Sequence, residues 1–478
     1  MLDPRISQAL LKLTDCSKEP SLNLDHVSKI STILDQYFGD FGRSREFRGV
    51  EELLSPRIAE ILQLLGPEQG LAFATKYFLF CYTLTQNYKQ VQLAIYRDLA
   101  LPFKTWAEAR WAFLKSAVQR VTPGDEYVFV CRHAVTVGGY APGSSVYTFA
   151  KALLEGGKPV TVISLGGKSP EFEQLADKYV NFTLHQLEPI SLLIRMVSLI
   201  EILKILKPKV VLTEIEFDIV SIFSILNPNV PTIFLSPGYY NLPWFDKIGL
   251  TDNLSVSPVG DREEDFFEIP TYVASEILNP VVDQRSIEKT KSQLSVTQND
   301  FVIGSFARME KFQTQFLAVL KCVLNRIPNS KVILAGPNDR NPVANELAHF
   351  IEHKRAFVLP SSDVHVLGHC VDIGLDTFPT HSGFSILELM AKGVPVVAKM
   401  DEEMDSLWRQ RLPELMREND NELCDLICEI STKKQYLEKL SAKTKNFMNN
   451  NENDSIFLEA LDQAIHSVKS SADLQLAT

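Results

Sequence analysis

The segment VDIGLDTFPTHSGFSILELMAKGVPVVA, residues 371–398, has the residue types of a site for an anionic ligand. Its pattern predicts a strand, a turn of small and polar residues, a helix over residues 384–392 that Gly393 ends, and a second strand. The first turn of a helix carries unpaired N–H groups and the positive end of the helix dipole. Ser382 and Gly383 precede the helix and let a ligand approach the backbone, so we predict a diphosphate site there.

A carboxylate lies near the middle of the same predicted helix, among apolar residues that face the sheet. This residue is Glu388, with Leu387 and Leu389 on either side. A carboxylate so placed accepts hydrogen bonds from the hydroxyl groups of a ribose, which predicts a sugar-nucleotide ligand. The alternative is an acid on a solvent-exposed helix face.

These residues resemble the nucleotide-binding segment of the two-domain GT-B glycosyltransferases. The form LDTFP, followed by a small-residue turn and GVPVV, is similar to glycosyltransferase family 41, which includes the O-GlcNAc transferases, the SPINDLY-type enzymes and the bacterial adhesin-glycosylating transferases. Many GT-B enzymes carry a second Glu eight residues before the ribose-binding one; this chain has Thr380 there, and family 41 lacks that acid too. The resemblance implies a UDP-sugar donor and an inverting, metal-independent transfer.

A second stretch of the chain is similar to the same family. SFARMEK followed by NRIPNSKVIL resembles the family's strand, lysine-containing loop and helix ending in R-x-P-N-S, which places Lys311 on the diphosphate-binding lysine. Arg308 occupies a position where the family usually has Gln or Asn. A fixed ammonium and a helix N-terminus stabilise the negative charge of a leaving UDP. We therefore predict Lys311 as catalytic and Arg308 as donor-binding; the alternative for Lys311 is a lysine on a helix surface.

The resemblance also implies further contacts with the donor. His365 lies in DVHVLG, residues 363–368, for which we predict a strand, and it resembles the family histidine that packs against uracil. The alternative is a histidine of the core or of a sheet edge. The other donor-binding candidates, in the turn and at the start of the helix, are His381, Ser382, Gly383, Phe384 and Ser385.

The first half of the chain changes to a strand-like period after its N-terminal quarter. Apolar runs at residues 127–131, 159–165, 209–215 and 231–236 alternate with helical stretches. Nearly continuous apolar strands that alternate with helices predict a parallel sheet covered on both faces, which is a Rossmann-like domain.

Two loops at the ends of these strands are expected to face the cleft, as the equivalent GT-B loops do. The first contains Gly138 and Gly139 but no G-x-G-x-x-G, so a dinucleotide site is not supported. His133, before these glycines, is our candidate general base, with a structural histidine as the alternative. The second loop contains Tyr239 where the family has a histidine-containing loop, so the resemblance supplies no acid–base residue at that place.

The remaining segments predict helices. Residues 1–120 have apolar residues at helical spacing, without the repeat of tetratricopeptide arrays. We assign them to acceptor docking or structural support; the alternative is a purely structural cap. The predicted divisions are an all-helical N-terminal domain, an acceptor-side Rossmann-like domain, a UDP-sugar-binding Rossmann-like domain, C-terminal helices and a disordered tail, at residues 1–120, 121–282, 283–415, 416–470 and 471–478.

Composition limits the function classes. The 478 residues carry a net charge of −11, which argues against nucleic acid or an anionic membrane surface as the main partner. The most apolar helical run, residues 191–206, contains three charged residues and is too short to span a bilayer, and the N-terminus has no signal-peptide core. Seven scattered cysteines form no disulfide framework. We expect a cytoplasmic protein without stable membrane insertion.

The sequence predicts an α/β protein of the GT-B type that transfers a hexose or N-acetylhexosamine from a UDP-sugar to a polypeptide side chain. His349, Glu352 and His353 form H-x-x-E-H, but no third ligand is evident nearby, so we predict no metal and no cofactor besides the donor. Two alternatives stay open. The acceptor is a glycan or small molecule, or the chain is a degenerate GT-B scaffold that supports a partner glycosyltransferase.

Overall fold

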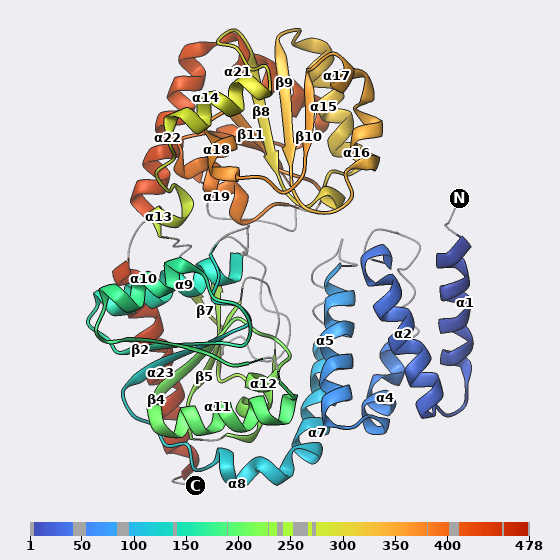
Figure 1. The fold of residues 1–478 in the computed structure, drawn as a ribbon, viewed down its shortest axis with the longest axis vertical. Coiled ribbons are helices and arrows are strands. Elements are labelled where there is room, and N and C mark those ends of the chain that lie inside the picture. Colours follow the sequence, from blue (N-terminus) through green and yellow to red (C-terminus); the bar gives the residue numbers. More distant parts are fainter. Residues whose placement is uncertain are drawn as a thin grey trace.

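A computed structural model gives the fold. It describes residues 4–41, 54–83, 95–136, 141–188, 190–227, 229–236, 242–251, 266–269, 274–379, 381–400, 411–451 and 454–476. Two parallel sheets, each with helices on its faces, form two α/β units, and a row of N-terminal helices stands beside the first unit (Figure 1).

The first sheet has seven strands in the order β3-β2-β1-β4-β5-β6-β7, all parallel. Their bounds are Glu126–Cys131 (β1), Val160–Ser164 (β2), Phe182–Gln186 (β3), Pro208–Thr213 (β4), Thr232–Ser236 (β5), Lys247–Thr251 (β6) and Phe266–Ile269 (β7). The four apolar runs predicted from the sequence are β1, β2, β4 and β5. The other three were not predicted, because β3 and β7 are edge strands and β6 contains Gly249, which weakens a strand pattern.

Five helices cover this sheet. They are α9 (Ala141–Glu155), α10 (Pro170–Lys178), α11 (Leu192–Leu206), α12 (Ile219–Leu226) and the last helix of the chain, α23 (Asp454–Leu476). The ring of Phe457 in α23 stacks on Phe149 in α9, with 4.4 Å between centroids. The C-terminus therefore returns to the first unit, and α23 extends to Leu476, into the stretch for which a disordered tail was predicted.

The second sheet has six parallel strands in the order β10-β9-β8-β11-β12-β13. Their bounds are Phe301–Phe306 (β8), Ser330–Ala335 (β9), Ala356–Leu359 (β10), Ile373–Leu375 (β11), Val396–Lys399 (β12) and Met416–Arg417 (β13). The accompanying helices are α13 (Ser275–Leu278), α14 (Gln284–Gln293), α15 (Thr314–Arg326), α16 (Asn341–Glu346), α17 (Ala348–Glu352), α18 (Val364–Gly368), α19 (Phe384–Ala391), α21 (Asp420–Thr432) and α22 (Lys434–Asn451). The predicted strand–turn–helix–strand of residues 371–398 is β11, α19 and β12.

The prediction of a strand at DVHVLG was wrong. Residues Val364–Gly368 form the short helix α18, and the Asp363 carboxylate caps it by accepting N–H bonds from His365 and Val366. The edge strand of this region is β10, which ends just before it. In so short a segment, alternating apolar residues are compatible with a capped helical turn as well as with a strand.

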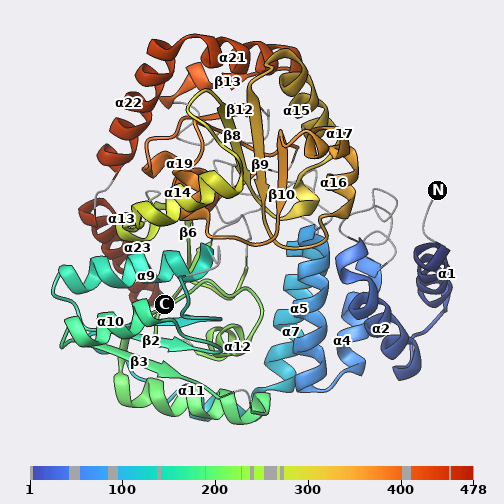
Figure 2. The ribbon, with the colours of Figure 1, turned by 45° about the horizontal axis from the view of Figure 1, so that its top comes forward.

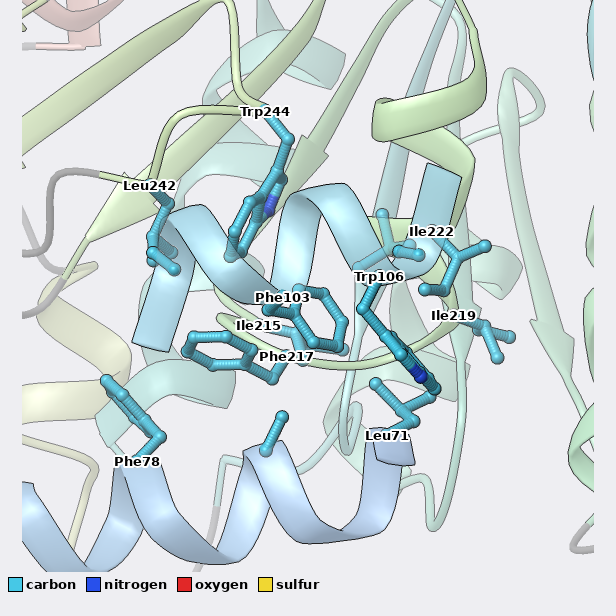
Figure 3. Packing of buried hydrophobic residues seen from close by; sticks show 14 of the residues in the cluster. Leu71, Phe78, Phe103, Trp106, Ile215, Phe217, Ile219, Ile222, Leu242 and Trp244 are labelled. Atoms are coloured by element: carbon cyan, nitrogen blue, oxygen red, sulfur yellow. The ribbon is translucent and has the colours of Figure 1, made fainter. Parts of the chain in front are cut away.

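The N-terminal helices share a hydrophobic core with the first α/β unit. They are α1 (Pro4–Lys18), α2 (Leu24–Phe41), α4 (Ile58–Leu64), α5 (Pro67–Thr83), α7 (Leu101–Arg110) and α8 (Lys115–Val118), and one continuous cluster joins them to β1, β4 and α12. α5, α4, α2 and α1 follow one another outward from the first unit (Figure 1, Figure 2). α5 and α7 contribute Phe78 and Phe103, which pack on Phe217 in the loop after β4 (Figure 3).

Candidate active site

Each sheet has one point at which its strand order reverses. It lies between β1 and β4 in the first sheet and between β8 and β11 in the second. In open α/β sheets, ligands bind outside the carboxyl ends of the strands at such switch points. The residues that follow these four strands are therefore the candidates for a binding site.

After β8, the 3-10 turn Met309–Lys311 (η6) carries the predicted catalytic lysine. The Lys311 Nζ donates a hydrogen bond to the backbone oxygen of His381, at 2.7 Å. Burial lowers the pKa of Lys311 to about 8; Arg308 acts in the same direction, and Asp376 and Glu310 oppose it. The side chain is thus mostly an ammonium at neutral pH, and it lies at the switch point, beside the turn that leads into α19.

After β11, Asp376 holds that turn in place. Its Oδ1 accepts a hydrogen bond from the Ser382 N–H and its Oδ2 one from the His381 Nδ1, both at 2.8 Å. The hydroxyls of Thr377 and Ser382 are 2.9 Å apart. Sequence reasoning missed Asp376; the signal was the aspartate of LDTFP with a histidine and a serine five and six residues later.

The turn leaves the N-terminus of α19 open. Gly383 is the N-cap residue and no side chain caps the helix, so the first N–H groups, at Phe384 and Ser385, are available to an acceptor. A Cβ atom placed on Gly383 would meet no atom of the described residues within 4 Å, so the backbone is open to a ligand at this position. Lys311 and this helix end therefore present positive charge together.

Arg308 is turned toward a carboxylate of its own loop. Its Nη1 lies 3.3 Å from the Oε1 of Glu310, whose Oε2 accepts a hydrogen bond from the Asn338 Nδ2 at 2.7 Å. The guanidinium is close enough to lower the pKa of Lys311. Its own partner, however, is Glu310.

A lysine that the sequence did not single out links α19 to His365. The Lys392 Nζ donates to the backbone oxygens of Glu388 and Leu278, at 2.9 and 2.7 Å, and lies 3.2 Å from the His365 Nδ1. Burial lowers the pKa of His365 to about 4, helped by Lys392, so the ring is neutral at pH 7. The bond to Leu278, at the end of α13, ties α19 to the segment that leads in from the first unit.

Glu388 itself is a buried acid, only 7% exposed. Burial raises its pKa to about 7, with Lys392 opposing and Asp363 adding to the rise. Among the described residues, the hydrogen bond that Glu388 accepts from Lys392 is to its backbone oxygen, so its carboxylate oxygens can accept hydrogen bonds from the hydroxyl groups of a ligand.

The first switch point has the opposite charge pattern. The Glu214 Oε1 accepts the backbone N–H of Arg132 at 3.0 Å, and the Arg132 Nη2 lies 3.8 Å from the Oε2 of Glu216. Burial raises the pKa of Glu216 to about 7, and Arg132 opposes the rise. Sequence reasoning missed these residues; the signal was the run TEIE at the end of a predicted strand.

His133, the predicted general base, packs against the loop after β2. Its Nδ1 accepts the N–H of Gly167 at 3.1 Å, and partial burial and Arg132 lower its pKa. With Nδ1 as an acceptor, the neutral ring carries its proton on Nε2. The remaining predicted loop residues, Gly138, Gly139 and Tyr239, lie outside the described residues.

The described part of the chain holds no group of three or more His, Cys, Asp or Glu side chains placed to bind a metal ion. The ring centroids of His349 in α17 and His353, the residue that follows this helix, are 4.5 Å apart. None of the helices in the described part is long and apolar enough to cross a bilayer.

Comparisons with known proteins identify the fold class. No protein-family model and no curated relative matches the sequence, but solved structures do. An O-GlcNAc transferase variant from Thermobaculum terrenum has a TM-score of 0.57 at 14% identity over 100% of both chains. A glycosyltransferase from Rickettsia africae has a TM-score of 0.56 at 16% identity over 72% of this chain and 99% of its own. Anabaena HepE, in complex with UDP and glucose, has a TM-score of 0.51 at 15% identity over 71% and 99%.

At these identities the similarity concerns the fold. The chain has the GT-B fold: two facing Rossmann-like units, preceded by an all-helical region. The predicted fold class is thereby confirmed. The similarity to the O-GlcNAc transferase variant extends over the N-terminal helices, whereas the other two structures match a shorter part of this chain.

Proposed function

We propose that this chain is a glycosyltransferase of the family 41 type. It transfers a hexose or an N-acetylhexosamine from a UDP-sugar to a polypeptide side chain, without a metal or another cofactor. The observation that carries the proposal is the position of Lys311, whose ammonium lies against the turn that opens the uncapped helix α19. The similar structures support the same class, since one is a glycosyltransferase and another is in complex with UDP and glucose.

The donor fits the second switch point part by part. The diphosphate lies at the N–H groups of Phe384 and Ser385, where the helix end favours an anion. Lys311 meets the charge that develops on the β-phosphate as the bond to the sugar breaks, which lowers the barrier without a divalent cation. Glu388 accepts hydrogen bonds from the ribose hydroxyls, and the neutral ring of His365 packs against the base.

The acceptor is assigned on the resemblance of the sequence to family 41. The solved structure that matches the whole chain, N-terminal helices included, is an O-GlcNAc transferase variant, which supports an acceptor of the same kind. A glycan acceptor remains the alternative that an experiment must separate, since the GT-B fold serves many acceptors.

The test begins with binding. Calorimetry with UDP, UDP-glucose, UDP-galactose and UDP-GlcNAc is expected to show binding of UDP and of at least one UDP-sugar. UDP release is then measured with and without a cell lysate as acceptor, and EDTA is expected to leave the rate unchanged. With a UDP-sugar that is labelled in its sugar, label is expected to reach macromolecules of the lysate. Protease treatment is expected to remove this label from them.

The outcomes separate the alternatives. Label that survives protease but not glycosidase would assign a glycan acceptor. UDP binding without release under any condition would favour a degenerate scaffold. Absence of UDP binding would reject the proposal altogether, and activity lost with EDTA and restored by Mn²⁺ would reject its metal-independent mechanism.

A further inference from the structure

The first switch point carries a charged cluster that the donor does not use. Glu214 and Glu216 follow β4, and Arg132 follows β1, the neighbouring strand in the sheet. Carboxylates there would repel a diphosphate, so this end of the sheet suits the other substrate. In the GT-B fold the two units face each other. Because the proposed donor site lies in the second unit, the acceptor is expected at the first.

We propose that Glu216 is the general base of the transfer, and that it takes the proton from an acceptor hydroxyl bound at the carboxyl ends of β1 and β4. This inference rests on the proposed function and deepens it. It assigns a role to a residue outside the stretches in which the chain resembles known glycosyltransferases most closely.

The loop that carries Glu216 is held from both sides. Phe217, the next residue, is fully buried, and its ring contacts Phe103 and Trp244 edge-on at 5.1 and 5.2 Å (Figure 3). Its backbone oxygen accepts a hydrogen bond from the Thr75 Oγ1 in α5 at 3.0 Å. A catalytic base must stay within hydrogen-bond reach of the proton it removes, and this packing fixes the backbone on which Glu216 stands.

The helix after this loop adds a second anchor. The Ser221 hydroxyl of α12 donates to the backbone oxygen of Glu216 at 2.7 Å, and Asp218 caps the same helix. The N-terminal helices and α12 therefore position the acid jointly. This assigns the all-helical region a structural role in catalysis, through α5 and α7, in addition to any contact with an acceptor.

The electrostatics suit a base that works near neutral pH. Burial brings the pKa of Glu216 to about 7, where proton removal is efficient, and Arg132 is the charged group that faces it. Glu214 keeps Arg132 in place by accepting its backbone N–H. His133 is less suited, because its Nδ1 already accepts the N–H of Gly167 and the other nitrogen carries the proton.

The step balances without a further reactant. The acceptor oxygen forms a bond to C1 of the sugar while the bond between C1 and the diphosphate oxygen breaks. The electron pair of that bond leaves with UDP, at Lys311 and α19, and the hydroxyl proton passes to the Glu216 carboxylate. The products are the inverted glycoside, UDP and a protonated acid that releases its proton to solvent.

The experiment uses the full chain and water as the acceptor, so that no acceptor need be known. The Glu216→Gln variant keeps the shape of the side chain and removes its basicity. UDP release from the UDP-sugar that binds best is expected to fall by about 100-fold or more in kcat, while calorimetry shows UDP binding as in the wild type. Azide has no proton to lose, so sodium azide is expected to restore release and to give the glycosyl azide.

Two variants complete the design. Glu216→Asp keeps a carboxylate at a shorter reach and is expected to retain an intermediate rate. Glu201→Gln removes an acid from the surface of α11, where it pairs with Lys204, and is expected to behave as the wild type.

Wild-type hydrolysis in Glu216→Gln would overturn the inference, and so would a slow variant that binds UDP but gains nothing from azide. If the wild-type chain itself binds neither UDP nor any UDP-sugar, the proposed function fails first. The two failures are therefore distinguishable.

Discussion

At the switch point of the second sheet, Lys311 and the N-terminus of α19 present positive charge, whereas at that of the first sheet Glu214 and Glu216 present carboxylates beside Arg132. The strands that lead to the two places are alike: parallel, apolar and buried. The difference lies in the residues directly after the strands, which the sheet positions but does not constrain chemically. Under the proposed function, one architecture binds an anionic leaving group in one unit and accepts a proton in the other.

The two places also differ in how they are held. Hydrogen bonds within the second unit, centred on Asp376, fix the donor side. Aromatic packing from outside the first sheet, by Phe103 of α7 and Trp244, fixes the acid side (Figure 3). Substitutions that remove the hydrogen bonds of Asp376 should therefore damage the donor side. Large-to-small substitutions in the N-terminal helices should damage the acid side.

The largest effect is expected from Lys311→Ala. The ammonium interacts more strongly with the charge that develops on the β-phosphate than with bound donor, so kcat should fall by about 100-fold or more while the donor KM changes less. Steady-state UDP release measures both constants, with circular dichroism as the check on folding. Lys321→Ala, which removes a lysine paired with Glu346 on the surface of α15, serves as the control. Near wild-type turnover in Lys311→Ala would show that the cation of the donor side lies elsewhere.

The pH profile of kcat/KM tests both switch points at once. Glu216 must be ionised and its pKa is about 7, so the rate should rise through that pH; Lys311 must be protonated and its pKa is about 8, so the rate should fall above it. On each limb the change should approach about tenfold for each pH unit. The groups that face Lys311 are Arg308, Asp376 and Glu310.

Variants assign the two limbs. Lys311→Arg is expected to lose the alkaline limb and Glu216→Gln the acid limb. Glu388 also has a pKa of about 7, so Glu388→Gln is the control for the acid limb. If the acid limb disappears in Glu388→Gln and persists in Glu216→Gln, the group that titrates on this limb is Glu388, on the donor side.

An intermediate effect is expected from Glu388→Gln. Replacing a charge-assisted hydrogen bond to the ribose should weaken UDP binding by about 1–2 kcal/mol, which calorimetry measures. Burial raises the pKa of Glu388 from 4.5 to about 7, so its contribution to folding stability is present below pH 4.5 and lost as the pH rises through 7. Above pH 7, the thermal unfolding temperature of the variant should therefore equal or exceed that of the wild type. A large loss of stability with intact UDP binding would make Glu388 a structural acid.

The smallest effect is expected from Arg308→Ala. Because the guanidinium pairs with Glu310, its loss should lower kcat much less than the loss of Lys311. It should also raise the pKa of Lys311 and shift the alkaline limb to higher pH, since a neighbouring positive charge is removed. A loss as large as that of Lys311→Ala would mean that Arg308 leaves Glu310 and reaches the phosphates.

The sequence by itself determined much of the second unit. β11, the turn after it, α19 and β12 were predicted because each is set by local features: apolar runs, small residues and Gly393 after the helix. Lys311 was singled out by the resemblance of SFARMEK to the lysine-containing loop of family 41, not by its spacing from that turn. DVHVLG failed because the side chain of Asp363, rather than the apolar alternation, decides its backbone.

Only the tertiary structure decided which distant residues meet. The Lys311 Nζ and the His381 oxygen are 70 residues apart in the chain, and Arg132 and Glu214 are 82 apart. The N-terminal helices, predicted as a domain of their own, join the core of the first unit through Phe103 and Phe217. The physical reason is that periodicity reports whether a side chain is buried, whereas its partner is selected by packing and by hydrogen bonds between segments that fold onto each other.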